Sequence, residues 1–157
     1  MSTRLPFGGD EPVVTASAAE TERLGEALAA LLAEDDVVYL EGELGAGKTT
    51  FVRGLARGLG APEREVASPT FALLHEYGTD GGGRIRLRHL DLYRLPDDPR
   101  QLEVFGFPDA FAGAPVCVEW PRAGVHGLLP ATWEVRIEAL EDERRRIVVS
   151  RRTLDEG

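Results

Sequence analysis

The residues with the clearest chemical signature form the stretch GELGAGKT, residues 42–49, which fills the pattern G-x-x-x-x-G-K-T. Glycines in such a loop let backbone N–H groups turn toward phosphate oxygens, and the helix that follows adds the partial positive charge of its N-terminus. Lys48 is then placed to reach the β and γ phosphates, Thr49 to offer its hydroxyl to Mg²⁺, and Thr50 to reach the α phosphate. We therefore predict a phosphate-binding loop and call residues 42–49 the P-loop.

The composition of the chain favours this interpretation and narrows the choice of nucleotide. Lys48 is the only lysine among 18 basic residues, and the chain contains no asparagine. A compact ammonium suits phosphate, so its use at this one position argues against a plain glycine-rich turn with a surface lysine. GTPases recognise guanine with an [N/T]-K-x-D stretch, which this composition excludes. We therefore predict ATP as the nucleotide.

Two acidic residues are candidates to complete the site. Glu119 follows the apolar run PVCV of residues 115–118, and Asp91 lies in RHLDLYRL, on or just after a strand. Hydrolysis or phosphoryl transfer needs such a carboxylate, either to hold Mg²⁺ or to orient a water. Each acid alone could be a strand-end carboxylate that caps a loop. His89 shares a strand face with Asp91, and we expect it to be a packed or hydrogen-bonded residue rather than a metal ligand.

The elements that must position these residues follow from the apolar patterns. DVVYLEG predicts a buried strand before the P-loop, and KTTFVRGLARGLG predicts a helix that starts at Lys48 and stops near Gly60. Upstream, PVVTAS reads as a short strand, and Ser17 with Glu20 forms a capping box that opens a helix ending near Glu34. The P-loop is therefore expected between a buried strand and an amphipathic helix.

Downstream segments predict further strands. PTFALLHEY and RIRLRHLDLYR alternate apolar and polar residues, so we expect a hairpin, and TWEVRIEAL with RRIVVSRR predicts an antiparallel pair at the end of the sheet. The segment PDDPRQLEVFGFPDAFAG suggests one or two short helices. These patterns predict one α/β domain over residues 12–150, with a mixed sheet, parallel in the core and antiparallel at its edges, flanked by helices. Residues 1–11 and 151–157 are expected to be tails.

Charge and composition exclude several classes of function. The formal net charge of −9 disfavours strong binding of nucleic acid by this chain alone. No signal-like N-terminal stretch and no run of about 18 apolar residues is present, so we expect a cytoplasmic protein without membrane contact. Cys117 lies in an apolar run and is expected to be a packed thiol without a role. Arg84, Arg86 and Arg88 alternate along one strand and form a basic stripe, which we call the arginine stripe. We interpret it as a solvated strand face, with a contact to a partner, or to nucleic acid held mainly by that partner, as the alternative.

Taken in order, GELGAGKTTFVRGLARGLG, SPTFALLHEY, HLDLYRL and VEWPRAG…LLP resemble the successive motifs of the TsaE family, also called YjeE. The resemblance covers roughly residues 13–140. It implies a single-domain P-loop NTPase fold and ATP hydrolysis coupled to a complex of TsaD and TsaB. That complex transfers a threonylcarbamoyl group onto the adenosine beside the anticodon of certain tRNAs, so the resemblance implies that tRNA is met only through the assembly.

The resemblance also implies roles for individual residues. The loop residues would bind ATP, Thr49 would ligate Mg²⁺ together with Glu119, and Asp91 would contact the nucleotide or its water. Thr70 in SPTF would act as a switch-like residue, and Trp120 would lie near the nucleotide, where it would stack or support a partner contact. Many members have an acid after E-W-P, whereas this chain has Arg122, which puts a second carboxylate in that segment in doubt. The set of loop residues is Gly45, Ala46, Gly47, Lys48, Thr49 and Thr50.

Two other classes of function remain open from the sequence. A small-molecule kinase also combines a P-loop with a compact α/β domain, but it usually needs a lid with arginines that close over the transferred phosphate. Between Leu95 and Pro115, where a lid would fit, the only arginine is Arg100. A module that senses ATP without hydrolysing it is the third class. No arginine finger is evident in a motif, so slow hydrolysis by the chain alone is expected.

Overall fold

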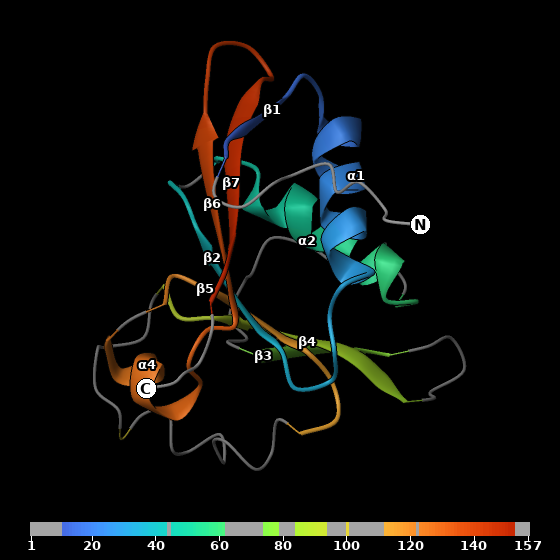
Figure 1. Ribbon diagram of the computed structural model, residues 1–157, viewed down its shortest axis with the longest axis vertical. Coiled ribbons are helices and arrows are strands. Elements are labelled where there is room, and N and C mark those ends of the chain that lie inside the picture. The colour runs from blue at the N-terminus through green and yellow to red at the C-terminus, as the bar shows by residue number, and fades with distance from the viewer. Residues whose placement is uncertain are drawn as a thin grey trace.

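The described residues form a seven-stranded sheet with helices packed on both of its faces. The computed structural model describes residues 11–43, 45–61, 74–78, 84–93, 100, 112–121 and 123–152 (Figure 1). The strands are β1 (Val13–Thr15), β2 (Val37–Glu41), β3 (Leu74–Gly78), β4 (Ile85–Asp91), β5 (Val116–Glu119), β6 (Trp133–Ala139) and β7 (Arg145–Arg151). The helices with assigned bounds are α1 (Ala18–Ala29), α2 (Lys48–Gly58) and α4 (Ala123–Leu128).

The strand order is β1-β7-β6-β2-β5-β4-β3. The four central strands β6, β2, β5 and β4 are parallel, whereas β1, β7 and β3 join at the edges in antiparallel pairing. The predicted mixed sheet, parallel in the core and antiparallel at its edges, is therefore confirmed, as is the hairpin pairing of β3 with β4. Because β2, β4 and β5 are parallel, their carboxyl ends meet at one edge of the sheet, where ligands bind in open α/β sheets.

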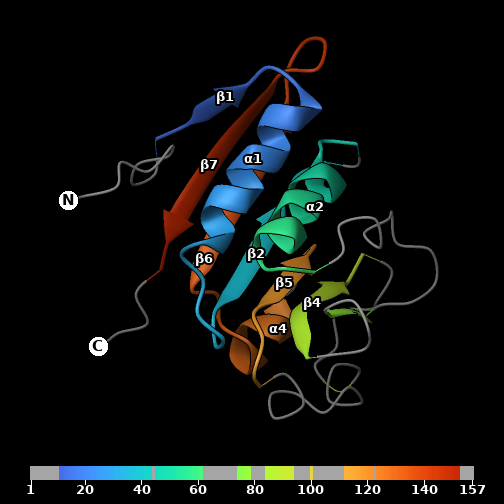
Figure 2. The same ribbon diagram turned by 90° about the vertical axis from the view of Figure 1, so that its right-hand side faces the viewer.

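Two apolar cores lie on opposite faces of the sheet. On one face, α1 and α2 lie side by side against the sheet (Figure 2), and Leu28, Phe51 and Leu55 are fully buried there. On the other face, α4 covers β2 and β5 through Val125, and Tyr39 donates its hydroxyl hydrogen to the Leu129 carbonyl (2.6 Å). The continuous apolar run of β2 is thus buried on both faces, as predicted for a central parallel strand.

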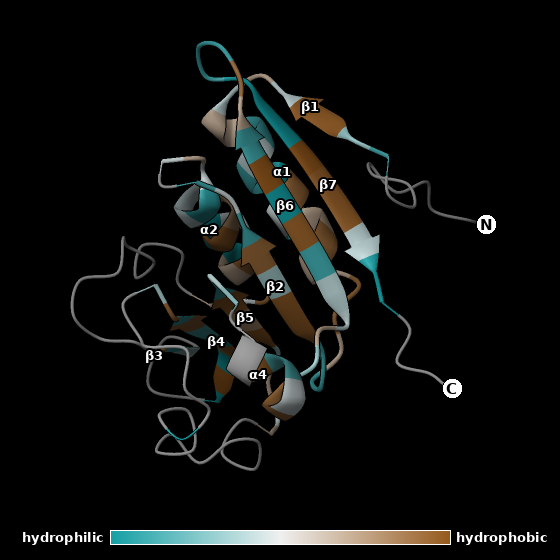
Figure 3. Cartoon of the chain, turned by 90° about the vertical axis from the view of Figure 1, so that its left-hand side faces the viewer, coloured by the Kyte–Doolittle hydropathy of each residue, from teal (hydrophilic) through white to brown (hydrophobic). Residues whose placement is uncertain are grey.

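No helix of the described residues covers the outer face of β6 and β7, and hydrophilic and hydrophobic residues alternate along these two strands (Figure 3). Two cross-strand ion pairs lie on this face, Arg146 with Glu138 and Arg152 with Glu134. The inner face of the same strands supplies Val135, Ile137 and Ile147 to the core under α1. The antiparallel part of the sheet therefore exposes one face to solvent and buries the other in the core.

Helix α1 begins as predicted but ends earlier. Ser17 is its N-cap and accepts a hydrogen bond from the Glu20 N–H, while the Glu20 carboxylate accepts from the Ala16 N–H. The prediction of an end near Glu34 is wrong, because the helix stops at Ala29. The next residues form tighter turns, and Asp36 accepts a hydrogen bond from the Ala33 N–H at 2.7 Å. This side-chain acceptor closes a turn that competes with further helix.

Helix α2 packs unusually closely against α1, and glycine makes this possible. A Cβ built on Gly54 would lie 2.0 Å from the backbone oxygen of Glu22 in α1. No side chain fits such a gap, so the two helix backbones approach as closely as they do only because residue 54 has none. The helix ends at Gly58, and Gly60 follows with a φ of 85° in the left-handed region, so the predicted stop is confirmed.

Helix α4 is an element that the sequence patterns did not predict. It spans six residues within the resemblance segment VEWPRAG…LLP and contains Gly124 and Gly127. The segment PDDPRQLEVFGFPDAFAG, predicted to hold short helices, lies almost entirely outside the described residues. Residue 151, where we predicted the C-terminal tail to begin, is the last residue of β7. None of the described helices has the length and apolar character needed to cross a membrane.

Candidate nucleotide-binding site

The P-loop connects β2 to α2 at the carboxyl edge of the sheet. Gly45 and Gly47 have φ angles of 79° and 107°, in the region that favours glycine. Gly47 is the N-cap of α2 and provides no side-chain cap, so no side-chain acceptor from the cap occupies the first N–H groups of the helix. Thr49 and Thr50 lie in the first turn of α2, and Ala46 is a buried residue of the loop itself. The arrangement suits an anion at the helix N-terminus.

Lys48 is buried with its ammonium inside the site. Its Nζ donates a hydrogen bond to the Gly42 carbonyl and lies 3.6 Å from the centre of the Trp120 ring. Burial lowers the pKa of Lys48, and the nearby carboxylates of Glu119 and Asp91 partly oppose this effect. The ammonium is therefore held between an aromatic face and two acids from neighbouring strands.

Asp91 and Glu119 occupy adjacent positions at the ends of β4 and β5. The two residues are partners in the parallel register, and only 6% and 3% of their surfaces are exposed. Burial raises the pKa of Asp91, although its carboxylate accepts a hydrogen bond from the Tyr93 N–H at 2.9 Å. The structure thus brings both predicted acids and Lys48 together. Carboxylates beside a P-loop match the way proteins bind Mg²⁺, with one or two acids and the phosphates of the substrate.

His89 holds Glu119 in place, which the sequence analysis did not foresee. His89 is completely buried; its Nε2 pairs with Glu119 Oε2, and its Nδ1 lies 3.2 Å from the Tyr77 hydroxyl. A neutral ring that donates from Nε2 to the carboxylate accepts from the Tyr77 hydroxyl at Nδ1. The expectation of a hydrogen-bonded strand residue is confirmed. Its partner could be found only from the register that places β4 beside β5.

Trp120 directly follows Glu119 and has a φ of 56°, an uncommon conformation for a residue with a large side chain. One neighbour of its ring is the Lys48 ammonium, and another is Tyr93, whose ring centre lies 4.9 Å away. Strained backbone of this kind is concentrated at functional sites. The structure therefore places Trp120 next to Lys48, and its role in stacking or in a partner contact stays a prediction.

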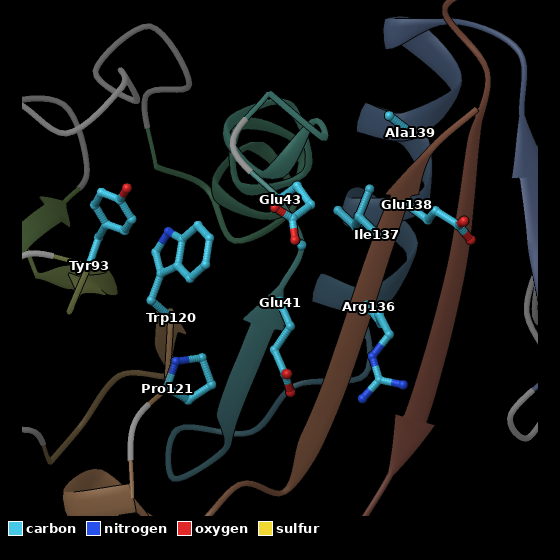
Figure 4. Close-up of a pocket in the computed structure, with 10 residues that line it drawn as sticks. Glu41, Glu43, Tyr93, Trp120, Pro121, Arg136, Ile137, Glu138 and Ala139 are labelled. Carbon is cyan, nitrogen blue, oxygen red and sulfur yellow. The ribbon is translucent and has the colours of Figure 1, made fainter. Parts of the chain in front are cut away.

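A cavity of about 740 Å³ adjoins the P-loop on the outer side of the sheet (Figure 4). Tyr93, Trp120 and Pro121 form one wall, and the end of β6 with Arg136 and Glu138 forms the opposite wall. Lys48, Asp91 and Glu119 do not line it. The cavity therefore flanks the predicted phosphate site and shares Trp120 with it.

The remaining candidate residues fall into two groups. Thr70 and Arg122 lie outside the described residues, as does most of the segment in which a kinase lid would lie. Cys117 is a free, fully buried thiol, and burial raises its pKa well above its usual value, which makes it a poor nucleophile. The expectation of a packed thiol is confirmed.

Two arginines of the arginine stripe, Arg84 and Arg88, are engaged within the protein. Arg88 bonds to the Glu76 carboxylate and to the Ala112 carbonyl (2.9 and 3.0 Å), and Arg84, just before β4, pairs with Glu34. Arg86 has a buried Nε for which the described part of the chain provides no hydrogen-bond partner. The stripe is thus partly neutralised by acids of the same chain.

Known proteins with similar sequences share one description. The family model described as threonylcarbamoyl adenosine biosynthesis protein TsaE matches residues 15–147. Proteins named tRNA threonylcarbamoyladenosine biosynthesis protein TsaE are similar in Treponema pallidum (41% identity; 87% of this chain, 98% of that protein) and Aquifex aeolicus (37% identity; 89% and 96%).

A solved structure agrees with the sequence comparison. The crystal structure of Bacillus subtilis YdiB is similar to this chain, with a TM-score of 0.64 and 31% sequence identity. The similarity covers 91% of this chain and 86% of that one. Three observations agree. The P-loop lies beside two buried acids on neighbouring strands, the family model spans most of the chain, and the similar proteins have nearly the same length. The chain belongs to the TsaE family.

Proposed function

We propose that this chain is a Mg²⁺-dependent ATPase of the machinery that makes N6-threonylcarbamoyladenosine in tRNA. Its hydrolysis of ATP would support or reset a complex of TsaD and TsaB type proteins. The observation that carries the proposal is the grouping of Lys48, Asp91 and Glu119 around the N-terminus of α2. The family description supplies the pathway.

Each residue of the site has a chemical task in this proposal. Lys48 and the first N–H groups of α2 bind the phosphates, and Thr49 and Glu119 are the residues that would hold Mg²⁺. The ion, when bound, neutralises charge on the phosphates. His89 fixes one oxygen of Glu119 and leaves the other for the site, and Asp91 contacts the nucleotide or its attacking water.

Binding of ATP requires Lys48 to change partners. In the structure its ammonium bonds to the Gly42 carbonyl and lies on the Trp120 ring. A phosphate offers a stronger, charge-assisted hydrogen bond than a carbonyl does, so the ammonium is expected to turn toward the nucleotide. Because Trp120 lies beside that ammonium, its fluorescence should change on binding, and Trp133→Phe would remove the signal of the second tryptophan.

The deciding experiment measures ATP turnover with and without TsaB and TsaD type proteins from the same source. We expect slow turnover by the chain alone and faster turnover with the partners, together with several rounds of tRNA modification that depend on this chain. Lys48→Ala and Glu119→Ala should abolish both effects. If the partners neither bind the chain nor depend on it for repeated modification, the proposal is wrong.

A further inference from the structure

An arginine from the far end of the chain lies against the P-loop. A Cβ built on Gly47 would lie 3.3 Å from Nε of Arg145 and 3.7 Å from its Cδ, so the arginine side chain passes beside the loop. Arg145 is the first residue of β7, and it shares the inner face of that strand with the core residues Ile147 and Val149. The hairpin between β6 and β7 thus carries a second cation to the N-terminus of α2.

Only backbone oxygens accept hydrogen bonds from this guanidinium among the described residues. Its Nη1 donates to the Arg144 carbonyl at 2.9 Å and, more weakly, to the Asp142 carbonyl at 3.4 Å. The next residue differs, because Arg146 points to the outer face and pairs with the Glu138 carboxylate. Arg145 is therefore oriented by its own turn while its charge stays without a counter-ion in the described part of the chain.

A cation at this position is electrostatically unfavourable unless an anion binds there. The N-terminus of a helix carries partial positive charge and favours anions over cations. Lys48 already lies at this helix end, and its charge faces Asp91 and Glu119 on the side of β4 and β5. Arg145 approaches from the opposite side, where β6 and β7 lie. An anion that extends across the loop between Lys48 and Arg145 would offset the repulsion between these cations and the positive end of the helix.

We infer that Arg145 contacts the bound nucleotide at its α-phosphate end, an inference that rests on the proposed function. Lys48 and the two acids mark the end of the site where the γ phosphate lies, because hydrolysis takes place there. The phosphate chain must then run across the P-loop toward β6 and β7, which brings the α phosphate to Arg145. A guanidinium is suited to this contact because its fork matches two phosphate oxygens. Gly47 leaves room for it, since a side chain at 47 would press on Arg145.

The test compares three ligands by isothermal titration calorimetry with the full chain and with Arg145→Ala. We expect the variant to bind ADP and ATP at least about tenfold more weakly, the usual loss for a hydrogen bond to a charged group. Inorganic pyrophosphate, which can fill the β and γ positions without an α phosphate, should bind with an almost unchanged dissociation constant. Arg145→Lys should lie between the variant and the wild type, because it keeps the charge but loses the fork.

Arg146→Ala is the matched control, since it removes the neighbouring arginine on the outer face and should leave all three affinities unchanged. Circular dichroism and the melting temperature confirm that each variant folds, and Arg145→Gln replaces Arg145→Ala if that variant does not. Unchanged ADP binding by Arg145→Ala would overturn the inference. Equal weakening of pyrophosphate binding would overturn the assignment to the α end. If the wild type itself fails to bind ATP, the proposed function fails as well.

Discussion

Glu119 is the residue on which the proposed chemistry depends most directly. It is buried, it is oriented by His89, and it lies next to Asp91 at the carboxyl edge of the sheet. We expect Glu119→Gln to reduce ATP turnover ~100-fold or more, because an amide cannot replace the negative charge at a metal site. Turnover is measured with saturating Mg²⁺ and ATP.

Glu134→Gln is the control for this substitution. Glu134 is also a glutamate on a parallel strand of the sheet, but it lies on the outer face and pairs with Arg152. Its variant should keep wild-type turnover. Equal turnover of Glu119→Gln and the wild type would remove Glu119 from the catalytic site.

Ionised Asp91 is expected to lower the stability of the folded protein although ATP turnover requires it. Burial raises its pKa above the ordinary value of 3.8, so the folded state binds this proton more tightly than the unfolded state does. The wild type therefore loses stability as the pH rises from that ordinary value through the raised pKa. Asp91→Asn cannot ionise, so it should melt at a higher temperature than the wild type at pH 7 while losing ATP turnover.

The pH dependence provides the check on Asp91. The difference in melting temperature between Asp91→Asn and the wild type should shrink as the pH falls through the raised pKa to below 3.8, where Asp91 is protonated in both the folded and the unfolded state. Thermal melts at several pH values measure this difference. A difference that is constant over the whole range would mean that ionisation of Asp91 carries no cost in the folded state.

At the scale of elements, the contact between α1 and α2 sets the position of the P-loop helix. Gly54→Ala gains about 1 kcal/mol of helix propensity. The new methyl group would meet the Glu22 backbone oxygen, however, so the helices must separate. We expect a net loss of about 1–3 kcal/mol of unfolding free energy, the usual cost of overpacking. Chemical denaturation measures it.

Gly127 in α4 offers a matched helical control. A Cβ at this position meets nothing within 4 Å. Gly127→Ala should therefore leave the stability unchanged or raise it by up to about 1 kcal/mol. If both alanine variants stabilise the protein, the close helix contact is not a constraint on its sequence.

At the scale of the whole molecule, the charge distribution argues against direct binding of tRNA. The chain has a net charge of −9, and its arginine stripe is partly engaged by Glu34 and Glu76. We expect no saturable binding of tRNA below about 100 μM at physiological salt, measured by filter binding. Tight binding that is lost on combined substitution of Arg84, Arg86 and Arg88 by alanine would contradict this prediction.

Local patterns in the sequence predicted most of the elements and the members of the site. The P-loop, the apolar run of β2 and the acid that ends the run of β5 are short-range features, because loop chemistry and burial period repeat within a few residues. The end of α1 was misjudged, since the apolar Leu31 and Leu32 continue the pattern after the helix has stopped. Helix α4 was missed because it is short and contains glycines.

The sequence by itself determined the prediction of a phosphate site and of Lys48, Asp91 and Glu119 as its charged side chains. Only the tertiary structure decided which distant residues join it. The pairing of β4 with β5 brings His89 to Glu119, and the hairpin of β6 and β7 brings Arg145 to Gly47. Such contacts depend on strand order and register, which are set by packing across the whole sheet and leave no signal within a short stretch of sequence.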